Sequence, residues 1–135
     1  METIADLYLG GFFERFPTIE IVFAEMGVRW IPYFVERLQY SIDRYQHIDG
    51  NQARRPVLET FNHNMYFTFQ FDRLGDDLLE TLSPSRVMWG SDFPYAESTY
   101  PLSRQVADDL RARVGDSDSE LILHRNAQRL FRFPA

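Results

Sequence analysis

The sequence predicts an α/β fold in which a parallel sheet of three strands is flanked by helices. Three apolar segments have the length and composition of buried strands, at residues 19–24, 65–71 and 86–89. Segments with a helical spacing of apolar residues separate and follow them, and strands that alternate with helices favour a parallel sheet. With 135 residues, 44% of them apolar, and no repeat or Gly/Ser linker, the chain is expected to form one packed unit.

Each predicted strand has its own signal. Residues 19–24 (IEIVFA) form an apolar run with β-branched members between Pro17 and Gly27, which is typical of a strand buried on both faces. Residues 65–71 (MYFTFQF) alternate strictly between apolar side chains and Tyr, Thr and Gln, so that two different faces are formed. Residues 86–89 follow a Pro-Ser break in the chain.

Four segments have the apolar spacing of amphipathic helices. In the first, apolar side chains recur every three or four residues, at Ile31, Phe34, Val35, Leu38, Ile42 and Tyr45. A short helix is expected over residues 74–82, on Leu74, Leu78, Leu79 and Leu82. Two more are expected near the end of the chain, one on Leu102, Val106 and Leu110 and the last on Leu123, Ala127, Leu130 and Phe131.

Charge and cysteine content exclude several classes of function. Twenty acidic against 14 basic residues give a net charge of -6, which repels nucleic acid and anionic membrane surfaces. The absence of cysteine removes disulfides, thiolate metal sites and cysteine nucleophiles, and no apolar run approaches the roughly 20 residues of a spanning helix. We therefore expect a cytoplasmic protein that binds neither nucleic acid nor membrane.

A parallel sheet of only three strands leaves two edges open, whereas such sheets need covered faces and protected edges. Three explanations are consistent with the sequence. The first residues hide another element, the chain is part of a larger α/β body, or the edges pair with another chain. The motifs described next favour the larger body.

The most informative motif is VMWGSDFPYAES at residues 87–98, where an apolar strand delivers Asp92 just beyond its C-terminal end. In parallel α/β folds, ligands and catalytic groups gather at that end. Strand alternation would place Asp92 on the face of Gly90 and Met88, where the small Gly90 leaves room. The carboxylate is suited to bind a metal or to accept a proton from metal-bound water; alternatively, Asp92 and Ser91 cap the following turn.

Glu25 follows the first strand in the same manner, so that it and Asp92 are expected at one rim of the sheet. The two acids either share acid and base roles or hold a cation, or they are two solvated loop carboxylates. Gln70, near the end of the middle strand, is expected to line the same pocket.

The three histidines and Arg37 are weaker candidates. His47 follows a helix, His63 precedes the second strand and so lies at the opposite rim, and His124 lies on the last helix. Because no His-x-His or His-x-x-x-His spacing occurs, we expect all three to be structural or exposed. Arg37 is either a solvated helix residue or a contact for an anionic substrate or a neighbouring subunit.

The stretches at residues 10–38, 86–98 and 124–131 closely resemble the amidohydrolase-related family of metal-dependent hydrolases, in the branch of aminocarboxymuconate-semialdehyde decarboxylase. The resemblance implies the C-terminal half of a (β/α)8 TIM barrel, with the three strands as the sixth, seventh and eighth. Because a full barrel has about 250 residues, residues 1–135 are expected to be a single partial domain, and Met1 to be an internal methionine of a longer reading frame.

The same resemblance implies site residues. Asp92 matches the aspartate that binds a single divalent metal, commonly zinc, while the family's histidine ligands fall before Met1. Glu25 stands where decarboxylase relatives often have a histidine. Tyr95 stands where the aspartate motif of many relatives continues with a histidine. Arg37 lies close to an arginine that some relatives use against a substrate carboxylate across a dimer contact.

Two hypotheses follow from these observations. In the first, the chain is part of a metal-dependent hydrolase or decarboxylase that acts on a small carboxylated substrate. Asp92 and Glu25 are then catalytic, Asp92 is the metal ligand, and the substrate is bound by Gln70, Tyr95 and Arg37. In the second, the chain is a non-catalytic half-barrel that associates through its strand edges, with itself as a homodimer or with a separate N-terminal half. Under both hypotheses the isolated chain is expected to lack turnover.

Overall fold

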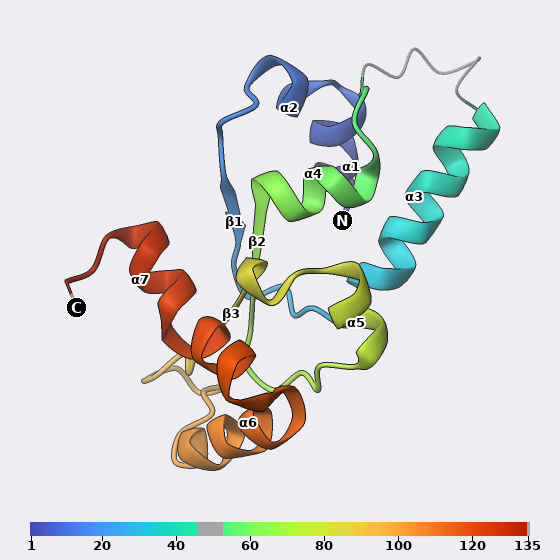
Figure 1. Ribbon diagram of the computed structural model, residues 1–135. Helices are drawn as coiled ribbons and strands as arrows, with labels where there is room; N and C mark the ends of the chain where they lie inside the picture. Colours follow the sequence, from blue (N-terminus) through green and yellow to red (C-terminus); the bar gives the residue numbers. More distant parts are fainter. Residues whose placement is uncertain (46–52, 135) are drawn as a thin grey trace.

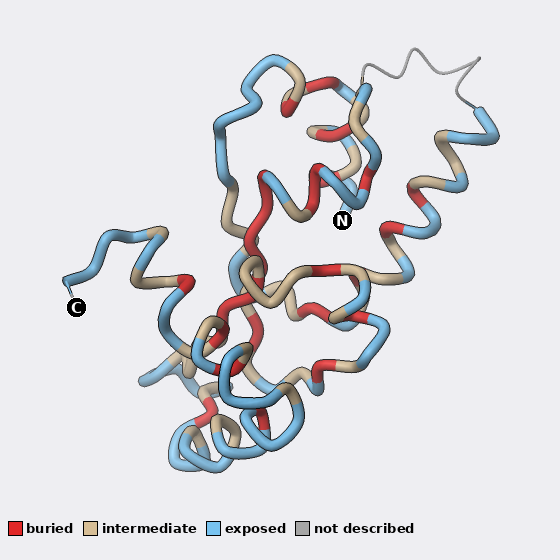
Figure 2. The backbone as a smooth tube through the Cα atoms, in the orientation of Figure 1, coloured by how far each residue is buried: buried red, intermediate tan, exposed pale blue. Residues whose placement is uncertain are grey.

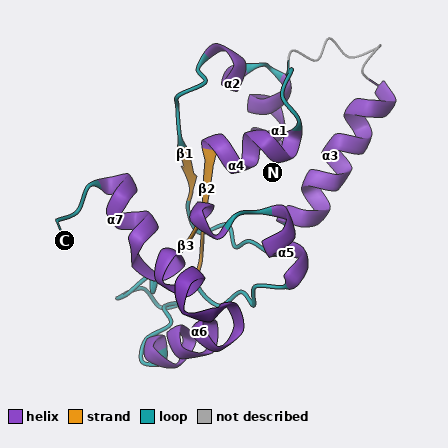
Figure 3. Ribbon diagram, viewed as in Figure 1, coloured by secondary structure: helices purple, strands orange, loops and turns teal. Residues whose placement is uncertain are grey.

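The computed structural model describes residues 1–45 and 53–134. Its centre is a three-stranded parallel sheet in the order β1 (Ile21–Phe23), β2 (Met65–Phe69) and β3 (Val87–Trp89) (Figures 1 and 3). Phe67 of β2 lies opposite Phe23 on one side and Val87 on the other. The predicted fold class, three parallel strands with flanking helices, is confirmed.

Seven helices accompany the sheet in the described residues. They are α1 (Glu2–Leu9), α2 (Phe12–Arg15), α3 (Ile31–Tyr45), α4 (Val57–Asn64), α5 (Asp76–Thr81), α6 (Ser103–Glu120) and α7 (Asn126–Phe131). A π-helical turn (Leu121–Arg125) joins the last two, and α6 bends at Gly115, whose φ of 83° lies outside the helical region. None of the described helices combines the length and apolar character needed to cross a lipid bilayer.

The predicted helix from Ile31 to Tyr45 matches α3, whereas α1, α2 and α4 were not predicted. These three helices have eight residues or fewer, too few for an apolar period to stand out. The predicted strands at 19–24 and 65–71 are longer than observed. One reason is Asn64, whose side-chain amide donates to the carbonyls of Pro17 and Ile19 at 2.9 and 2.7 Å, so that the segment before β1 is held by a side chain instead of a strand.

An apolar core lies on the side of the sheet that carries α3, α4 and α5. The Phe67 ring is stacked between Phe23 and Phe61, with centroids 5.4 and 5.7 Å away, and Trp30 meets it edge-on at 5.9 Å. Phe61 and Phe67 are fully buried. Figure 2 shows buried residues concentrated along the strands and on the inner sides of the helices. The same apolar core includes Leu110 of α6 and Ile122 of the π-helical turn.

The opposite face of the sheet has a different chemistry. Tyr66 and Met88 are buried there without belonging to the apolar core. The Tyr66 hydroxyl donates to Glu20 at 3.3 Å and accepts from Arg129 at 3.3 Å, and the Arg86 guanidinium lies 4.7 Å above the Tyr66 ring. This polar cluster occupies the end of the sheet where the strands begin.

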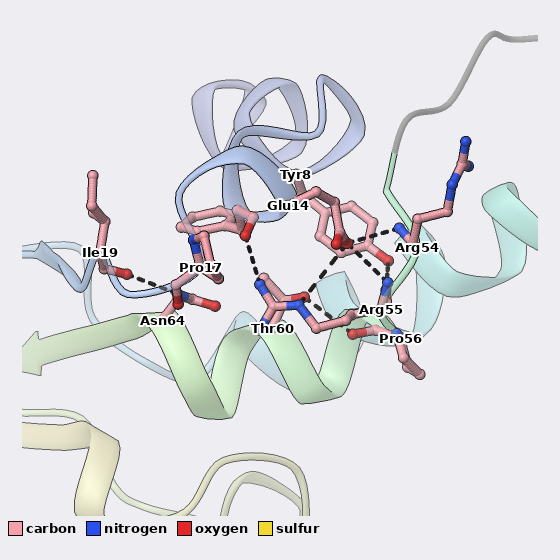
Figure 4. Close-up of polar contacts among 10 residues, drawn as sticks. Tyr8, Glu14, Pro17, Ile19, Arg54, Arg55, Pro56, Thr60 and Asn64 are labelled. Carbon is pink, nitrogen blue, oxygen red and sulfur yellow. Dashed lines mark hydrogen bonds and ion pairs between the residues drawn. The ribbon is translucent and has the colours of Figure 1, made fainter.

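A second polar cluster ties α1 and α2 to the segment before α4 (Figure 4). One carboxylate oxygen of Glu14 accepts the backbone N–H groups of Arg54 and Arg55 at 2.8 and 3.0 Å, and these hydrogen bonds lower the pKa of Glu14. The Tyr8 hydroxyl donates to the carbonyl of Arg55. Burial, with a smaller contribution from Glu14, raises the pKa of Tyr8 to about 12.

Candidate active site at the C-terminal rim

The candidate site lies where the three strands end. Because the strands are parallel, their C-terminal ends share one edge of the sheet, which is where α/β proteins place their ligands. Figure 1 shows α1, α2 and α4 gathered at the other end, where β2 begins, while α6 lies beyond the end from which the loops leave. Asp92, Glu25 and Gln70 all come directly after strands and so lie at this rim.

Asp92 lies in a tight turn after β3, and its backbone has a φ of 57°. The turn is closed by other groups: the Asp92 carbonyl accepts the N–H of Tyr95 at 2.8 Å, and the Ser91 hydroxyl accepts the N–H of Phe93 at 3.4 Å. Within the described residues no hydrogen bond or ion pair reaches the Asp92 carboxylate. Ser91 therefore performs the capping, and the partly buried carboxylate of Asp92 remains available for a ligand.

The alternation of side chains along β3 does not extend to Asp92, contrary to the prediction from the sequence. Regular pairing ends at Trp89, followed by one hydrogen bond from Gly90 to the Phe69 carbonyl. The left-handed backbone of Asp92 then redirects the chain. The expected space at Gly90 is present, since a Cβ built there would have no atom within 4 Å.

Glu25 repeats this geometry after β1. Its φ is 60°, and its N–H donates to the Thr68 hydroxyl of β2 at 2.9 Å. The Glu25 side chain is exposed, and within residues 1–45 and 53–134 no ion pair involves it. Left-handed conformations cost energy for residues with a Cβ and are found preferentially at functional sites, so the two acids share both position and backbone strain.

The predicted substrate-binding residues lie in three places. Gln70 is half-buried and lines a pocket of about 390 Å³ that it shares with Arg29 and Arg73. Tyr95 lies in the Asp92 turn with 65% of its surface exposed. Arg37 is exposed on α3, its guanidinium 5.0 Å from the centroid of the Tyr40 ring. The structure therefore brings Gln70 and Tyr95 to the rim by their loops and leaves Arg37 on a helix surface.

The histidines do not contribute to this rim. His63 is exposed in the last turn of α4, before β2, and His124 is exposed in the π-helical turn; His47 lies outside the described residues. In the part of the chain that the structure describes, no three His, Asp or Glu side chains come together as a metal site. Asp92 offers one oxygen ligand, so a metal centre here requires ligands from beyond this part.

Three further residues lie at the rim that were not predicted from the sequence, namely Thr68, Arg29 and Arg73. Thr68 binds the backbone of Glu25 from the adjacent strand, a contact that depends on strand register. Arg29 and Arg73 follow the ends of β1 and β2 by six and four residues and line the same pocket. Their positions after strand ends were a usable signal, but their convergence depends on how the loops fold.

Comparison with known proteins places this geometry in a family. The amidohydrolase family model matches residues 1–133. The chain is 26% identical over 127 residues to a gamma-resorcylate decarboxylase of Polaromonas sp., covering 90% of this chain and 37% of that protein. It is also similar to the crystal structure of 5-carboxyvanillate decarboxylase from Sphingomonas paucimobilis, with 28% identity, a TM-score of 0.79, and coverage of 96% of this chain and 38% of that one.

A further structure, a dihydroxybenzoic acid decarboxylase of Polaromonas sp. with bound manganese and the inhibitor 2-nitroresorcinol, is 22% identical with a TM-score of 0.72, over 96% of this chain and 38% of that chain. The chain thus spans less than two fifths of the length of these relatives. This coverage agrees with the predicted C-terminal portion of a barrel. Since the family model matches almost every residue, the chain belongs to the amidohydrolase family.

Proposed function

We propose that this chain is the C-terminal part of a metal-dependent decarboxylase that acts on a small carboxylated aromatic compound. The observation that carries the proposal is the Asp92 carboxylate, which is delivered to the C-terminal rim by β3 and is not engaged by any described side chain or backbone group. Two relatives over 25% identical are named for removing a carboxyl group from an aromatic acid. Decarboxylation is therefore favoured over hydrolysis.

In this proposal Asp92 is one ligand of a divalent metal, and the other ligands come from a polypeptide segment outside residues 1–135. Zinc is the expected ion, although a carboxylate oxygen suits manganese equally well, the ion bound in one relative. When bound, the metal orients substrate oxygens and stabilises developing negative charge.

The remaining rim residues then act on the substrate. Loss of a carboxyl group requires a proton at the carbon that carried it, and in this proposal the exposed carboxyl of Glu25 exchanges that proton. Gln70 and Tyr95 can hydrogen-bond and orient the aromatic acid from the loops after β2 and β3. Arg37 of one subunit can bind a substrate carboxylate only if a dimer contact brings its guanidinium to the C-terminal rim of the other subunit.

The open edges of the sheet support a proposal about partners. The outer strand β1 is only partly buried along its whole length, as expected for a strand that lacks a neighbour. We propose that it pairs with the N-terminal part of the barrel; the alternative is a non-catalytic half-barrel that associates through its strand edges, with itself as a homodimer or with a separate N-terminal half. Sedimentation of the isolated chain distinguishes them, because a stable monomer excludes the homodimer. The cytoplasm is the proposed compartment.

The experiment that tests the function uses the complete barrel that contains these residues. The protein is stripped with a chelator, reloaded with zinc or manganese, and assayed for carbon dioxide release from 2,6-dihydroxybenzoate and 5-carboxyvanillate. We expect turnover with at least one acid, loss on stripping, and recovery on reloading. Equal turnover in the stripped and reloaded protein would contradict the proposed metal dependence. Hydrolysis of an amide or ester without decarboxylation would contradict the proposed reaction type.

A further inference from the structure

Three arginines converge on one pocket at the C-terminal rim. Arg29 comes from the loop after β1, Arg73 from the loop after β2 and Arg113 from α6. With Gly75, Asp77 and Leu78 they line a pocket of about 340 Å³. Since the three side chains come from segments far apart in the sequence, their convergence is a product of the fold.

The charge of this pocket is opposite to that of the chain. Its lining carries three guanidinium groups against the single carboxylate of Asp77, whereas the whole protein has a net charge of -6. None of the ion pairs found among residues 1–45 and 53–134 includes Arg29, Arg73 or Arg113. The positive charges are therefore not neutralised by neighbouring side chains at ion-pair distance.

One of the arginines is fixed by the backbone. The Nε of Arg113 donates to the carbonyl of Leu74, which holds the side chain beside the loop after β2 and leaves its two terminal nitrogens free to donate elsewhere. A guanidinium held in this way can present its remaining N–H groups to a planar or tetrahedral oxyanion.

The other two arginines also line the adjacent 390 Å³ pocket, which reaches Gln70 and Asp72. The Asp72 carboxylate packs against the loop after β1, since a Cβ built on Gly27 would lie 2.9 Å from its Oδ2. Gly27 has a φ of 64°, a conformation that favours glycine. This close approach brings the two arginine-bearing loops together and leaves Arg29 and Arg73 facing both pockets.

We infer that Arg29, Arg73 and Arg113 form a binding site for a small oxyanion, a carboxylate or phosphate group, beside the catalytic rim. Asp92 lines neither pocket, so binding of the oxyanion does not require the proposed metal ligand, although Arg29 and Arg73 share the 390 Å³ pocket with Gln70, the proposed substrate contact. Bidentate contacts from two or three guanidiniums give such a site both affinity and a preference for multiply charged anions.

The test is a calorimetric titration of the 135-residue chain with inorganic phosphate and with phthalate, at constant ionic strength set by sodium chloride. Wild-type protein is compared with Arg29→Gln, Arg73→Gln and the matched control Arg104→Gln, an exposed arginine on α6 that lines neither pocket. Loss of one charge-assisted contact should weaken binding roughly tenfold in each of the first two variants. The control should stay within about twofold of wild type.

The two probes identify the source of the oxyanion. Tighter binding of phosphate indicates a phosphoryl group, and tighter binding of phthalate indicates a carboxylate ligand; both support the site when Arg29→Gln and Arg73→Gln weaken it. The inference is overturned if wild-type protein with native circular dichroism shows no saturable binding. It is also overturned if Arg104→Gln weakens binding as much as the pocket variants do, since the effect would then be one of net charge.

Discussion

The two ends of the sheet differ in whether their polar side chains have hydrogen-bond partners. At the end where β2 begins, Glu14 accepts two backbone N–H groups and the Tyr8 hydroxyl has a carbonyl partner. At the end where the strands finish, no described residue forms a hydrogen bond or ion pair with the carboxylate of Asp92 or of Glu25. Both residues also have a left-handed backbone conformation. The first arrangement stabilises the fold, and the second keeps reactive groups available at a cost in stability.

This difference predicts that changes at the rim impair activity and changes at the opposite end impair stability. The clearest rim test is Asp92→Asn in the complete barrel. Loss of an anionic metal ligand should lower turnover about 100-fold or more, while the midpoint of urea unfolding of the metal-free protein stays unchanged. Metal content and turnover are measured on the same preparation, with Asp6→Asn on α1 as the matched control. Full metal occupancy and normal turnover in Asp92→Asn would remove Asp92 from the site.

At the other end the largest effect is expected for Asn64→Ala. Asn64 is buried and its amide satisfies the carbonyls of Pro17 and Ile19, so its removal leaves two acceptors without that donor. The free energy of unfolding should fall by about 2 to 3 kcal/mol, as measured by urea titration. Asn62→Ala, which loses a contact to Thr81 and one to Ser83, should be similarly costly. A neutral Asn64→Ala would contradict the structural role assigned to this end.

These two ends were not equally predictable from the sequence. The three strands and α3 follow from apolar patterns, and the position of Asp92 and Glu25 after strand ends follows from the strands. The clusters around Glu14 and around Arg29 could not be predicted from the sequence, because they join residues about 40 positions apart. The strain at Glu25 and Asp92 was also missed, since the sequence pattern around them suggested continued alternation.

The backbone strain at Glu25 leads to a third prediction, in which a substitution increases the free energy of unfolding. Glu25→Gly should stabilise the chain by about 1 kcal/mol, because glycine adopts a φ of 60° without the steric cost of a Cβ. The same substitution at Glu36, an exposed position within α3, should destabilise it by about 1 kcal/mol. Urea unfolding of both variants measures the difference. If Glu25→Gly is as destabilising as Glu36→Gly, the left-handed backbone at Glu25 carries no strain.

The smallest expected effect lies at the opposite end and depends on pH. Backbone N–H donors from Arg55 and Arg54 lower the pKa of Glu14, so its ionised form is favoured in the folded state. This contribution is fully present above the unfolded pKa of about 4.3 and is lost as pH falls through the lower folded pKa. Glu14→Gln should therefore reduce stability by less than about 1 kcal/mol at neutral pH and flatten the decline of stability below about pH 4. Urea unfolding from pH 7 to 3, with Glu36→Gln as control, measures this, and an unchanged acid slope would mean that the Glu14 cluster does not hold α2 against the segment before α4.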